Sequence, residues 1–167
     1  FPEGGDLVAG LSNKIAFKAN DQWGKPVKVK GTITDTQGKV IDSLRTMHNG
    51  MGYFMIIPKE GMVYTANWKD EKEVGHTTKL PAVKTSGVSL QVYVTSGNRR
   101  FQLNYTPGLA AANDSLHIIG TMFQHEVFRV TKSTSTTEIK GTVPIQNLPS
   151  GILTFTVFDK SWNPLAE

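Results

Sequence analysis

The sequence predicts an all-β protein whose antiparallel strands fall into two sets arranged in tandem. Its 18 Thr, 14 Val and 10 Ile residues make up about a quarter of the 167-residue chain, and β-branched side chains suit the half-buried surface of a sheet. The 16 Gly and 8 Pro residues recur at short intervals, as tight turns between short strands require. No window of about eleven residues carries the 3.6-residue period of an amphipathic helix.

Alternation of apolar and polar residues marks the strands of the first half. In the clearest case Val27, Val29 and Ile33 alternate with lysine and threonine residues, so one face of the strand is apolar and the other is polar and faces solvent. The same two-residue period recurs along this half of the chain. The predicted strands are Lys14–Ala19, Val27–Asp35, Val40–Thr46, Met51–Ile57, Val63–Lys69 and Glu73–Leu80.

A second set of strands follows in the second half. Leu90, Val92 and Val94 form an apolar face there, and Pro107–Ala112 is the one stretch that suits a single helical turn or a loop. The predicted strands are Val88–Thr95, Arg99–Tyr105, Leu116–Gln124, Val127–Thr131, Thr137–Val143 and Ile152–Phe158.

The two sets of strands meet at a short stretch that has the composition of a linker. Leu80–Ser86 contains a proline and small polar residues, so we expect one sandwich over residues 1–82 and a second over residues 86–167. The sequence begins without Met and ends just after a strand-and-turn pattern. We therefore expect it to be a piece of a longer polypeptide.

Three stretches have the residue pattern of a hairpin turn that begins with aspartate. They start at Asp21, Asp35 and Asp159, and the first two place a glycine three residues later. An aspartate in this position accepts hydrogen bonds from backbone amides further along the turn, and the later residue adopts the left-handed conformation. In the third copy we expect Asn163 to take the role of the glycine. A calcium loop of the EF-hand type would need further carboxylates that these stretches lack.

Composition excludes several classes of function. The chain has no cysteine, which rules out disulfides, thiolate metal sites and cysteine nucleophiles. Its apolar runs are far shorter than the roughly 20 residues that span a bilayer, so no membrane span is expected. The formal net charge is +4, but the basic residues are spread along the chain without a stripe of interleaved aromatic residues. We therefore expect no nucleic-acid partner.

The residues that carry catalysis in other proteins do not gather into a motif here. The four histidines, His48, His76, His117 and His125, lack metal-ligand spacing, and alternation points His117 to solvent. The acidic stretch Asp70–Glu73 is flanked by lysines and reads as a solvated turn. We expect no enzyme activity and no cofactor. The remaining catalytic alternative is a hydrolase that uses His48 or His125 as its base.

The three tryptophans are the candidate contact residues. Trp23 and Trp162 lie inside aspartate-initiated turns, and Trp68 lies near the end of a predicted strand. Exposed aromatic residues of this kind anchor protein partners or stack on sugar rings. The alternative is that each ring folds back over its own hairpin and buries its surface there.

Several stretches resemble the macroglobulin-like β-sandwich modules of large exported Bacteroidota proteins. The likeness rests on segments at the start, middle and end of the chain. They are Phe1–Leu11, Asn13–Ala19, Gly50–Phe54, Pro58, Gly61–Ala66, Leu148–Ile152, Thr156–Asp159 and Pro164–Glu167. Some proteins with such modules are related to α-2-macroglobulins, and others carry the plug domain of a TonB-dependent receptor. The Cys-Gly-Glu-Gln thioester of α-2-macroglobulin is missing here, so protease trapping is not expected.

The resemblance implies two antiparallel β-sandwich domains of the immunoglobulin or fibronectin type in tandem. It also implies a non-enzymatic structural or interaction segment of a larger periplasmic or cell-surface protein, linked to an outer-membrane transport or macroglobulin-like system. The implied partners are other domains of the same chain and another envelope protein. Asp42-Ser43-Leu44 and Asp114-Ser115-Leu116 match the short pattern on which Bacteroidota attach O-glycans to exported proteins, which favours the same compartment. The alternative function is a carbohydrate-binding sandwich module that contacts a glycan through Trp23, Trp68 and Trp162.

Overall fold

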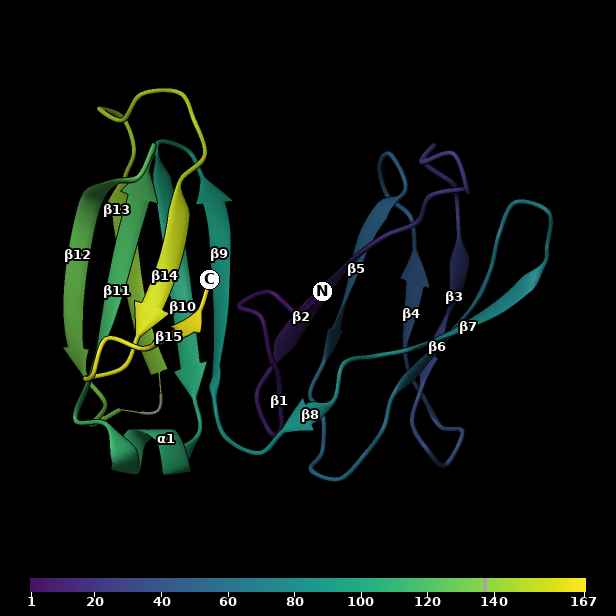
Figure 1. Ribbon diagram of the computed structural model, residues 1–167, viewed down its shortest axis with the longest axis horizontal. Helices are drawn as coiled ribbons and strands as arrows, with labels where there is room; N and C mark the ends of the chain where they lie inside the picture. Colours follow the sequence, from purple (N-terminus) through teal and green to yellow (C-terminus); the bar gives the residue numbers. More distant parts are fainter. Residues whose placement is uncertain (137) are drawn as a thin grey trace. The chain divides into compact units, whose positions relative to one another are not determined.

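The computed structural model describes residues 1–136 and 138–167, and nearly all of its regular structure is β-strand (Figure 1). Strands account for 54% of the residues and helix for 4%, which confirms the prediction of an all-β fold. The chain divides into two compact units. Unit 1 comprises Phe1–Pro2 and Leu7–Lys84, and unit 2 comprises Glu3–Asp6 and Thr85–Glu167. That each unit folds as an independent domain stays a prediction.

Unit 1 contains two facing sheets and one short pair of strands. Its strands are β1 (Leu7–Val8), β2 (Asn13–Lys18), β3 (Lys30–Thr34), β4 (Val40–Arg45), β5 (Met51–Ile56), β6 (Thr65–Lys69), β7 (Gly75–Lys79) and β8 (Val83–Lys84). One sheet has the spatial order β4-β3-β6-β7, and a second pairs β2 with β5. Both are antiparallel, whereas β1 and β8 pair in parallel.

The core of unit 1 follows from the alternation of side chains along these strands. In β5, Phe54 and Ile56 are buried while Tyr53 and Met55 face solvent. Ile33 of β3 is completely buried in the same apolar cluster, so the core receives side chains from both larger sheets. Burial of each large aliphatic or aromatic side chain stabilises the fold by about 1.5–3 kcal/mol, which fixes the face that each strand turns inward.

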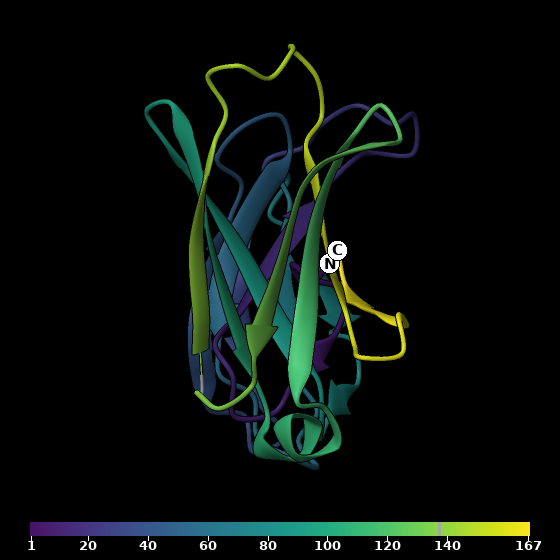
Figure 2. The same cartoon turned by 90° about the vertical axis from the view of Figure 1, so that its left-hand side faces the viewer.

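Unit 2 is also a sandwich of two antiparallel sheets. Its elements are β9 (Val88–Thr95), β10 (Asn98–Tyr105), α1 (Pro107–Ala112), β11 (Ser115–Met122), β12 (His125–Ser133), β13 (Glu138–Pro144), β14 (Thr154–Phe158) and β15 (Pro164–Ala166). The sheets have the orders β13-β10-β9 and β12-β11-β14-β15. They form separate layers, with α1 at one end of the sandwich (Figure 2).

The apolar core of unit 2 joins both of its sheets. Leu103 of β10, Leu116 and Ile118 of β11 and Val157 of β14 are completely buried in one cluster. Thr106 caps the start of helix α1, because its side chain accepts a hydrogen bond from the Leu109 amide, and the helix ends at Ala112. Of the two possibilities for this stretch, a helical turn or a loop, the structure has the helix.

The predicted strands are all present, but the structure corrects the stretches between them. The predicted linker Leu80–Ser86 contains β8, which pairs with β1 instead of connecting two domains freely. Neither of these two-residue strands was predicted, nor was β15 at the end of the chain. The strand predicted to begin at Val27 begins at Lys30, and the start of the predicted strand at Thr137 lies outside the described residues.

Four hairpin turns share the geometry expected for an initial aspartate. In each, one oxygen of Asp21, Asp35, Asp70 or Asp159 accepts hydrogen bonds from the amides two and four residues later, over 2.8–3.0 Å. The residue three positions after the aspartate is left-handed. These residues are Gly24, Gly38, Glu73 and Trp162, with φ of 78°, 77°, 58° and 65°. The prediction that Asn163 takes the left-handed position in the last turn is wrong.

Candidate functional site

The three candidate tryptophans lie in different surroundings. Trp23 lies in the first aspartate turn of unit 1 and is 77% exposed, without a ring contact to any described residue. Trp68 of β6 is half-buried against the core of unit 1. Trp162 lies in the β14–β15 turn of unit 2 and is 47% exposed. Trp68 thus packs within its own β6–β7 hairpin, Trp162 packs mainly on strands outside its hairpin, and Trp23 has no ring contact to a described residue; the role of the three as contact residues stays a prediction.

Trp162 lies over the outer face of the sheet that contains β11. Its ring stacks on the His117 imidazole with the centroids 4.2 Å apart and the planes 7° from parallel. The Phe158 ring is tilted beneath it at 5.9 Å, and the Arg129 guanidinium lies 5.3 Å from the indole centroid. We call these four residues the Trp162 platform.

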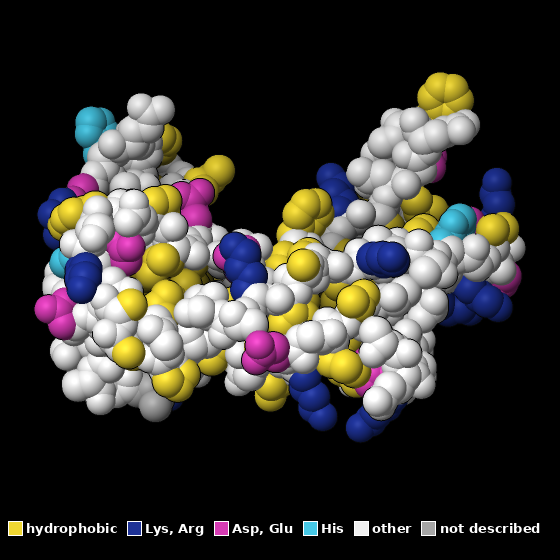
Figure 3. Space-filling model, turned by 60° about the horizontal axis from the view of Figure 1, so that its bottom comes forward, with side chains coloured by type: hydrophobic (Ala, Val, Ile, Leu, Met, Phe, Trp, Pro, Cys, Tyr) yellow, Lys and Arg dark blue, Asp and Glu magenta, His cyan; other side chains and the backbone are white. Residues whose placement is uncertain are grey.

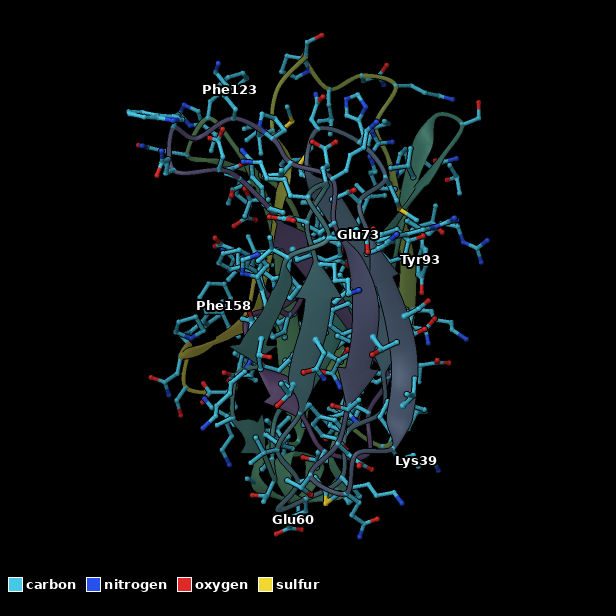
Figure 4. All side chains as sticks on the ribbon, turned by 90° about the vertical axis from the view of Figure 1, so that its right-hand side faces the viewer. Lys39, Glu60, Glu73, Tyr93, Phe123 and Phe158 are labelled. Atoms are coloured by element: carbon cyan, nitrogen blue, oxygen red, sulfur yellow. The ribbon has the colours of Figure 1, made fainter. Side chains whose placement is uncertain are left out.

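Strand register explains why the members of the Trp162 platform meet. His117 pairs with Thr131 of β12 on one side and with Phe158 of β14 on the other. Arg129 lies two residues from Thr131, so it shares the same face of the sheet. Figure 4 shows Phe158 and Tyr93 on opposite sides of unit 2, at the outer faces of its two sheets. The platform is thus assembled from three strands and one turn.

Polar partners hold the Trp162 platform in place. The Nδ1 atom of His117 lies 2.9 Å from the Thr131 hydroxyl oxygen. The Nε atom of Arg129 donates to both carboxylate oxygens of Glu126, at 3.2 and 3.1 Å, and this hydrogen bonding raises the pKa of the Arg129 guanidinium. These bonds position His117 and Arg129 against the indole of Trp162.

The turn that carries Trp162 is closed by Asp159. Its Oδ1 atom accepts hydrogen bonds from the Ser161 and Asn163 amides, both at 2.8 Å. The Oδ2 atom accepts a third from the Asn163 side chain at 2.9 Å. The side-chain and backbone hydrogen bonds from Asn163 lower the pKa of the Asp159 carboxyl, and desolvation opposes them only in part. The carboxylate therefore stays ionised as the acceptor that shapes the turn.

Trp68 belongs to a related stack in unit 1. It pairs directly with His76 of β7, and the two rings stack with centroids 4.2 Å apart and planes 19° from parallel. The indole Nε1–H donates to the Thr78 hydroxyl at 3.0 Å. Gly31 of β3 lies opposite Trp68, and a Cβ at Gly31 would meet the Trp68 Cβ at 2.8 Å. Only glycine leaves room for Trp68 at this position.

A groove of about 280 Å³ opens beside Trp68 in unit 1. Its walls come from β2 of one sheet and from β6 and the end of β7 of the other. Most of the lining is apolar and includes Phe17, Phe54, Trp68 and Leu80. It lies between the two sheets, and Phe1, which pairs with β2, is among its lining residues.

Unit 2 has a larger but more polar depression on the outer face of the sheet that contains β9, with a volume of about 470 Å³. Gln102 and Lys140 line it, and both contact the Glu138 carboxylate at 2.6 Å. The Tyr93 hydroxyl donates to Gln91 at 2.5 Å. These polar groups already bond with one another along and across the strands. The depression is therefore a hollow among paired side chains on the surface of the sheet.

The other titratable residues serve turns and strand edges. His48 lies in a hairpin turn beside left-handed Asn49, and His125 begins β12 in the other unit. Glu73 binds Lys30 at 2.7 Å and Lys69 at 3.4 Å, so the acidic turn is charge-balanced as expected, with Lys30 as its main partner. The part of the chain that the structure describes contains no group of three metal-ligating side chains.

The charged side chains on one face of the molecule are scattered. On the face of the molecule shown in Figure 3, lysine and arginine side chains lie singly or in small groups among apolar and neutral ones. Among the described residues, no helix is long and apolar enough to cross a membrane.

Sequence reasoning found Trp162 but missed the residues beneath it. His117, Phe158 and Arg129 come from three separate strands, so only the register brings them together. One local signal was available, because Trp162 occupies the position that holds glycine in the Asp21 and Asp35 turns. A bulky residue at a left-handed position is rare unless packing holds it there.

Comparison with known proteins adds no relative from which a role could be transferred. No known protein family matches this chain, and a search of curated proteins finds no match to its sequence.

Proposed function

We propose that this chain is a non-enzymatic interaction segment of a larger periplasmic or cell-surface protein, and that the Trp162 platform is its contact surface for another envelope protein. The proposal is supported most by the position of Trp162, an aromatic residue in a left-handed turn with 47% of its surface exposed. Aromatic residues that are rigid before binding lose little conformational entropy on association and so make good anchors.

The energetics of Trp162 favour a role in contact over a role in stability. A left-handed backbone costs a residue with a Cβ about 1–2 kcal/mol, and glycine avoids this cost in the equivalent turns at Gly24 and Gly38. Stacking on His117 and tilting over Phe158 return about 1 kcal/mol each. The two terms nearly cancel, so tryptophan gives the turn little net stability over glycine. Its exposed indole surface is what tryptophan adds.

The location in the envelope is part of the proposal and is supported by sequence patterns. The resemblance to macroglobulin-like modules and the two Asp-Ser-Leu sites both favour an exported protein. Ser43 is exposed on β4, next to buried Leu44, so its hydroxyl is accessible for modification. Mass spectrometry of the protein purified from its own cells would detect a glycan at this serine.

Photo-crosslinking from within the turn tests the interaction directly. A photoreactive amino acid replaces exposed Lys160 in the full-length protein, and irradiation of living cells traps whatever lies against the Trp162 platform. We expect a discrete crosslinked product that disappears in the Trp162→Ala variant and persists in the matched control Trp23→Ala. A product that is unaffected by Trp162→Ala would contradict the proposal.

A carbohydrate ligand is the second candidate for the same surface. An exposed indole that is stacked on one side by His117 offers the flat apolar surface on which a sugar ring packs. A glycan array separates the two functions when intact protein is compared with the triple variant Trp23→Ala, Trp68→Ala, Trp162→Ala. Specific glycan binding that is lost in the triple variant and in Trp162→Ala alone would favour the carbohydrate function over the protein contact.

A further inference from the structure

We infer that the depression on the outer face of the sheet β13-β10-β9 binds a sugar residue that carries a carboxylate, as in an acidic polysaccharide. The site belongs to unit 2 and lies on the sheet opposite the one that carries the Trp162 platform, as the positions of Tyr93 and Phe158 in Figure 4 show. Three observations carry the inference: an unpaired guanidinium, an exposed aromatic ring beside it, and short polar side chains around both.

Strand register places the Arg100 side chain at the middle of this face. Arg100 of β10 is directly opposite Tyr93 of β9 on one side and Thr142 of β13 on the other. Directly opposite side chains on neighbouring strands point to the same face, with their Cβ atoms about 4.5–5.5 Å apart. Tyr93, Arg100 and Thr142 therefore form one row across the sheet, and all three line the depression of about 470 Å³.

The Arg100 guanidinium is exposed and carries a charge that the site does not balance. Among residues 1–136 and 138–167, no group accepts a hydrogen bond from it, forms an ion pair with it or stacks on it. Lys140, the other cation in the lining, is bound to Glu138 at 2.6 Å. An arginine side chain is a permanent cation, and its planar fork of N–H donors matches the two oxygens of a carboxylate. The depression therefore selects a ligand with a carboxylate at the centre of the sheet.

The Tyr93 ring supplies an apolar wall beside the guanidinium. It is 46% exposed, and its hydroxyl donates to Gln91, two residues earlier on the same strand. Gln91 is itself buried, so this bond holds the Tyr93 ring along β9 and limits its motion into solvent. An aromatic ring that is fixed before binding loses little conformational entropy when the apolar face of a sugar ring packs on it.

The other lining side chains suit the hydroxyl groups of a sugar. The Thr95 and Thr142 hydroxyls can donate and accept hydrogen bonds, and Gln102, whose amide nitrogen donates to Glu138, keeps its carbonyl oxygen as an acceptor. None of the described lining residues is aliphatic, and Phe101 is only 3% exposed. A peptide ligand would need apolar pockets for its anchor side chains. The lining therefore favours a carbohydrate over a polypeptide.

Titration of the intact chain with acidic oligosaccharides, followed by NMR, tests the site with defined probes. The panel contains short oligomers of galacturonate, glucuronate, mannuronate and guluronate, each matched by the same oligomer with its carboxyl groups reduced to alcohols. We expect at least one acidic oligomer to shift the backbone amide signals of Tyr93, Arg100 and Thr142. Its reduced counterpart is expected to bind at least about tenfold more weakly. Added salt should also weaken binding of the acidic oligomer, because it screens the carboxylate from the guanidinium.

Substitution of the central arginine provides the matched variants. Arg100→Gln is expected to weaken binding of the acidic oligomer at least about tenfold, and Arg100→Lys to restore only part of it, because lysine keeps the charge without the fork. The control Arg45→Gln removes the same group from an exposed strand position of unit 1 and is expected to change little. Tyr93→Ala is expected to weaken binding severalfold through loss of the ring. Unfolding curves of all four variants confirm that the fold is intact.

Several outcomes would overturn the inference. These are failure of the whole panel to bind, equal binding of the acidic and reduced oligomers, shifts confined to amides outside the sheet β13-β10-β9, or equal effects of Arg100→Gln and Arg45→Gln. Tighter binding of dextran sulfate at the same amides would show a general anion site, and tighter binding of polyglutamate would assign the face to an acidic polypeptide. Since Trp162→Ala is expected to leave binding of the acidic oligomer unchanged, the failure of this site and that of the Trp162 platform are distinguishable.

Discussion

Two tryptophan–histidine stacks, one in each unit, have nearly the same ring geometry, but their tryptophans differ in backbone conformation. In unit 1, Trp68 stacks on His76, and in unit 2, Trp162 stacks on His117, each at 4.2 Å between centroids. An aspartate turn lies beside each pair, and both turns place a residue other than glycine in the left-handed position. Trp68, however, lies on a regular strand, whereas Trp162 is itself the left-handed residue.

The difference shows how one pair of residue types serves two purposes. Trp68 lies on strand β6 opposite Gly31 and packs against the core, so its ring stabilises its own sandwich without a backbone cost. Trp162 gains about as much from its contacts as it loses through its backbone. The left-handed residue beside Trp68 is Glu73, whose carboxylate binds Lys30 and Lys69. Stability explains the first stack, and an exposed contact surface explains the second.

The largest expected effect follows from truncation of the two rings. Trp68→Ala removes packing against the core, the stack on His76 and the side chain that occupies the space beside Gly31. It is expected to lower the free energy of unfolding of unit 1 by about 3 kcal/mol. Trp162→Ala keeps the left-handed strain but loses both ring contacts, and is expected to cost unit 2 about 2 kcal/mol, while Trp23→Ala is expected to cost close to nothing. Urea unfolding measures the three free energies, with hydrogen exchange of the backbone amides reporting on each unit separately. Equal losses at Trp68 and Trp162 would break the comparison.

Glycine and alanine variants sharpen the comparison, because we expect their order of stability to be opposite at Trp162 and Trp68. At Trp162 glycine adopts φ near 65° without strain, so Trp162→Gly is expected to be about 1 kcal/mol more stable than Trp162→Ala. At Trp68, on a strand, Trp68→Gly is expected to be less stable than Trp68→Ala by about 0.5–1 kcal/mol. The same unfolding experiment compares the four variants. The same order of glycine and alanine at both positions would show that the left-handed turn carries no strain.

A smaller effect is expected from the two aspartates that close the turns. The pKa of Asp70 is below its ordinary value, because hydrogen bonds from the Val74 and Lys72 amides and contact with His76 together outweigh a desolvation that raises it. The pKa of Asp159 is lowered chiefly by Asn163. A carboxyl with a lowered folded pKa stabilises above its unfolded pKa, and this contribution is lost as the pH falls through the folded pKa.

Stability is therefore expected to stay level near neutral pH and to decline in the acid range, below the ordinary pKa of an aspartate. Asp70→Asn and Asp159→Asn should each flatten part of that decline, since asparagine does not titrate. The unfolding free energies of the variants and of the unchanged chain should converge at low pH, where the carboxyls are protonated. If the variants and the unchanged chain differ in unfolding free energy as much at low pH as at neutral pH, titration of these carboxyls does not cause the decline.

The smallest effect is expected at Glu73. Glu73→Gly relieves the left-handed backbone but removes the exposed ion pairs with Lys30 and Lys69, so the two changes offset each other. Unfolding at low and high salt separates them, because only the ion pairs are screened. A large loss of stability at both salt concentrations would mean that Glu73 holds the turn in a way that the ion pairs do not explain.

Sequence alone gave the strands because a buried face imposes a two-residue period, which is visible in stretches such as β5 and β11. It missed β1, β8 and β15 because strands of two or three residues are too short to show a period. It placed Asn163 in the left-handed position because local preference favours asparagine there, whereas the hydrogen bonds of the Asp159 turn make the third residue after the aspartate, Trp162, left-handed, as in the other three turns. The Trp162 platform and the groove beside β2 depend on pairings between distant strands, which no local pattern reveals.

The most direct test of the contact role of Trp162 is to measure crosslinking and stability together in Trp162→Gly. The photoreactive amino acid at position 160 reports the contact in cells, and urea unfolding of the same variant reports the stability of unit 2. We predict that crosslinking is lost while the free energy of unfolding changes by less than about 1 kcal/mol. Unchanged crosslinking would contradict the account, as would a loss of stability as large as that of Trp68→Ala.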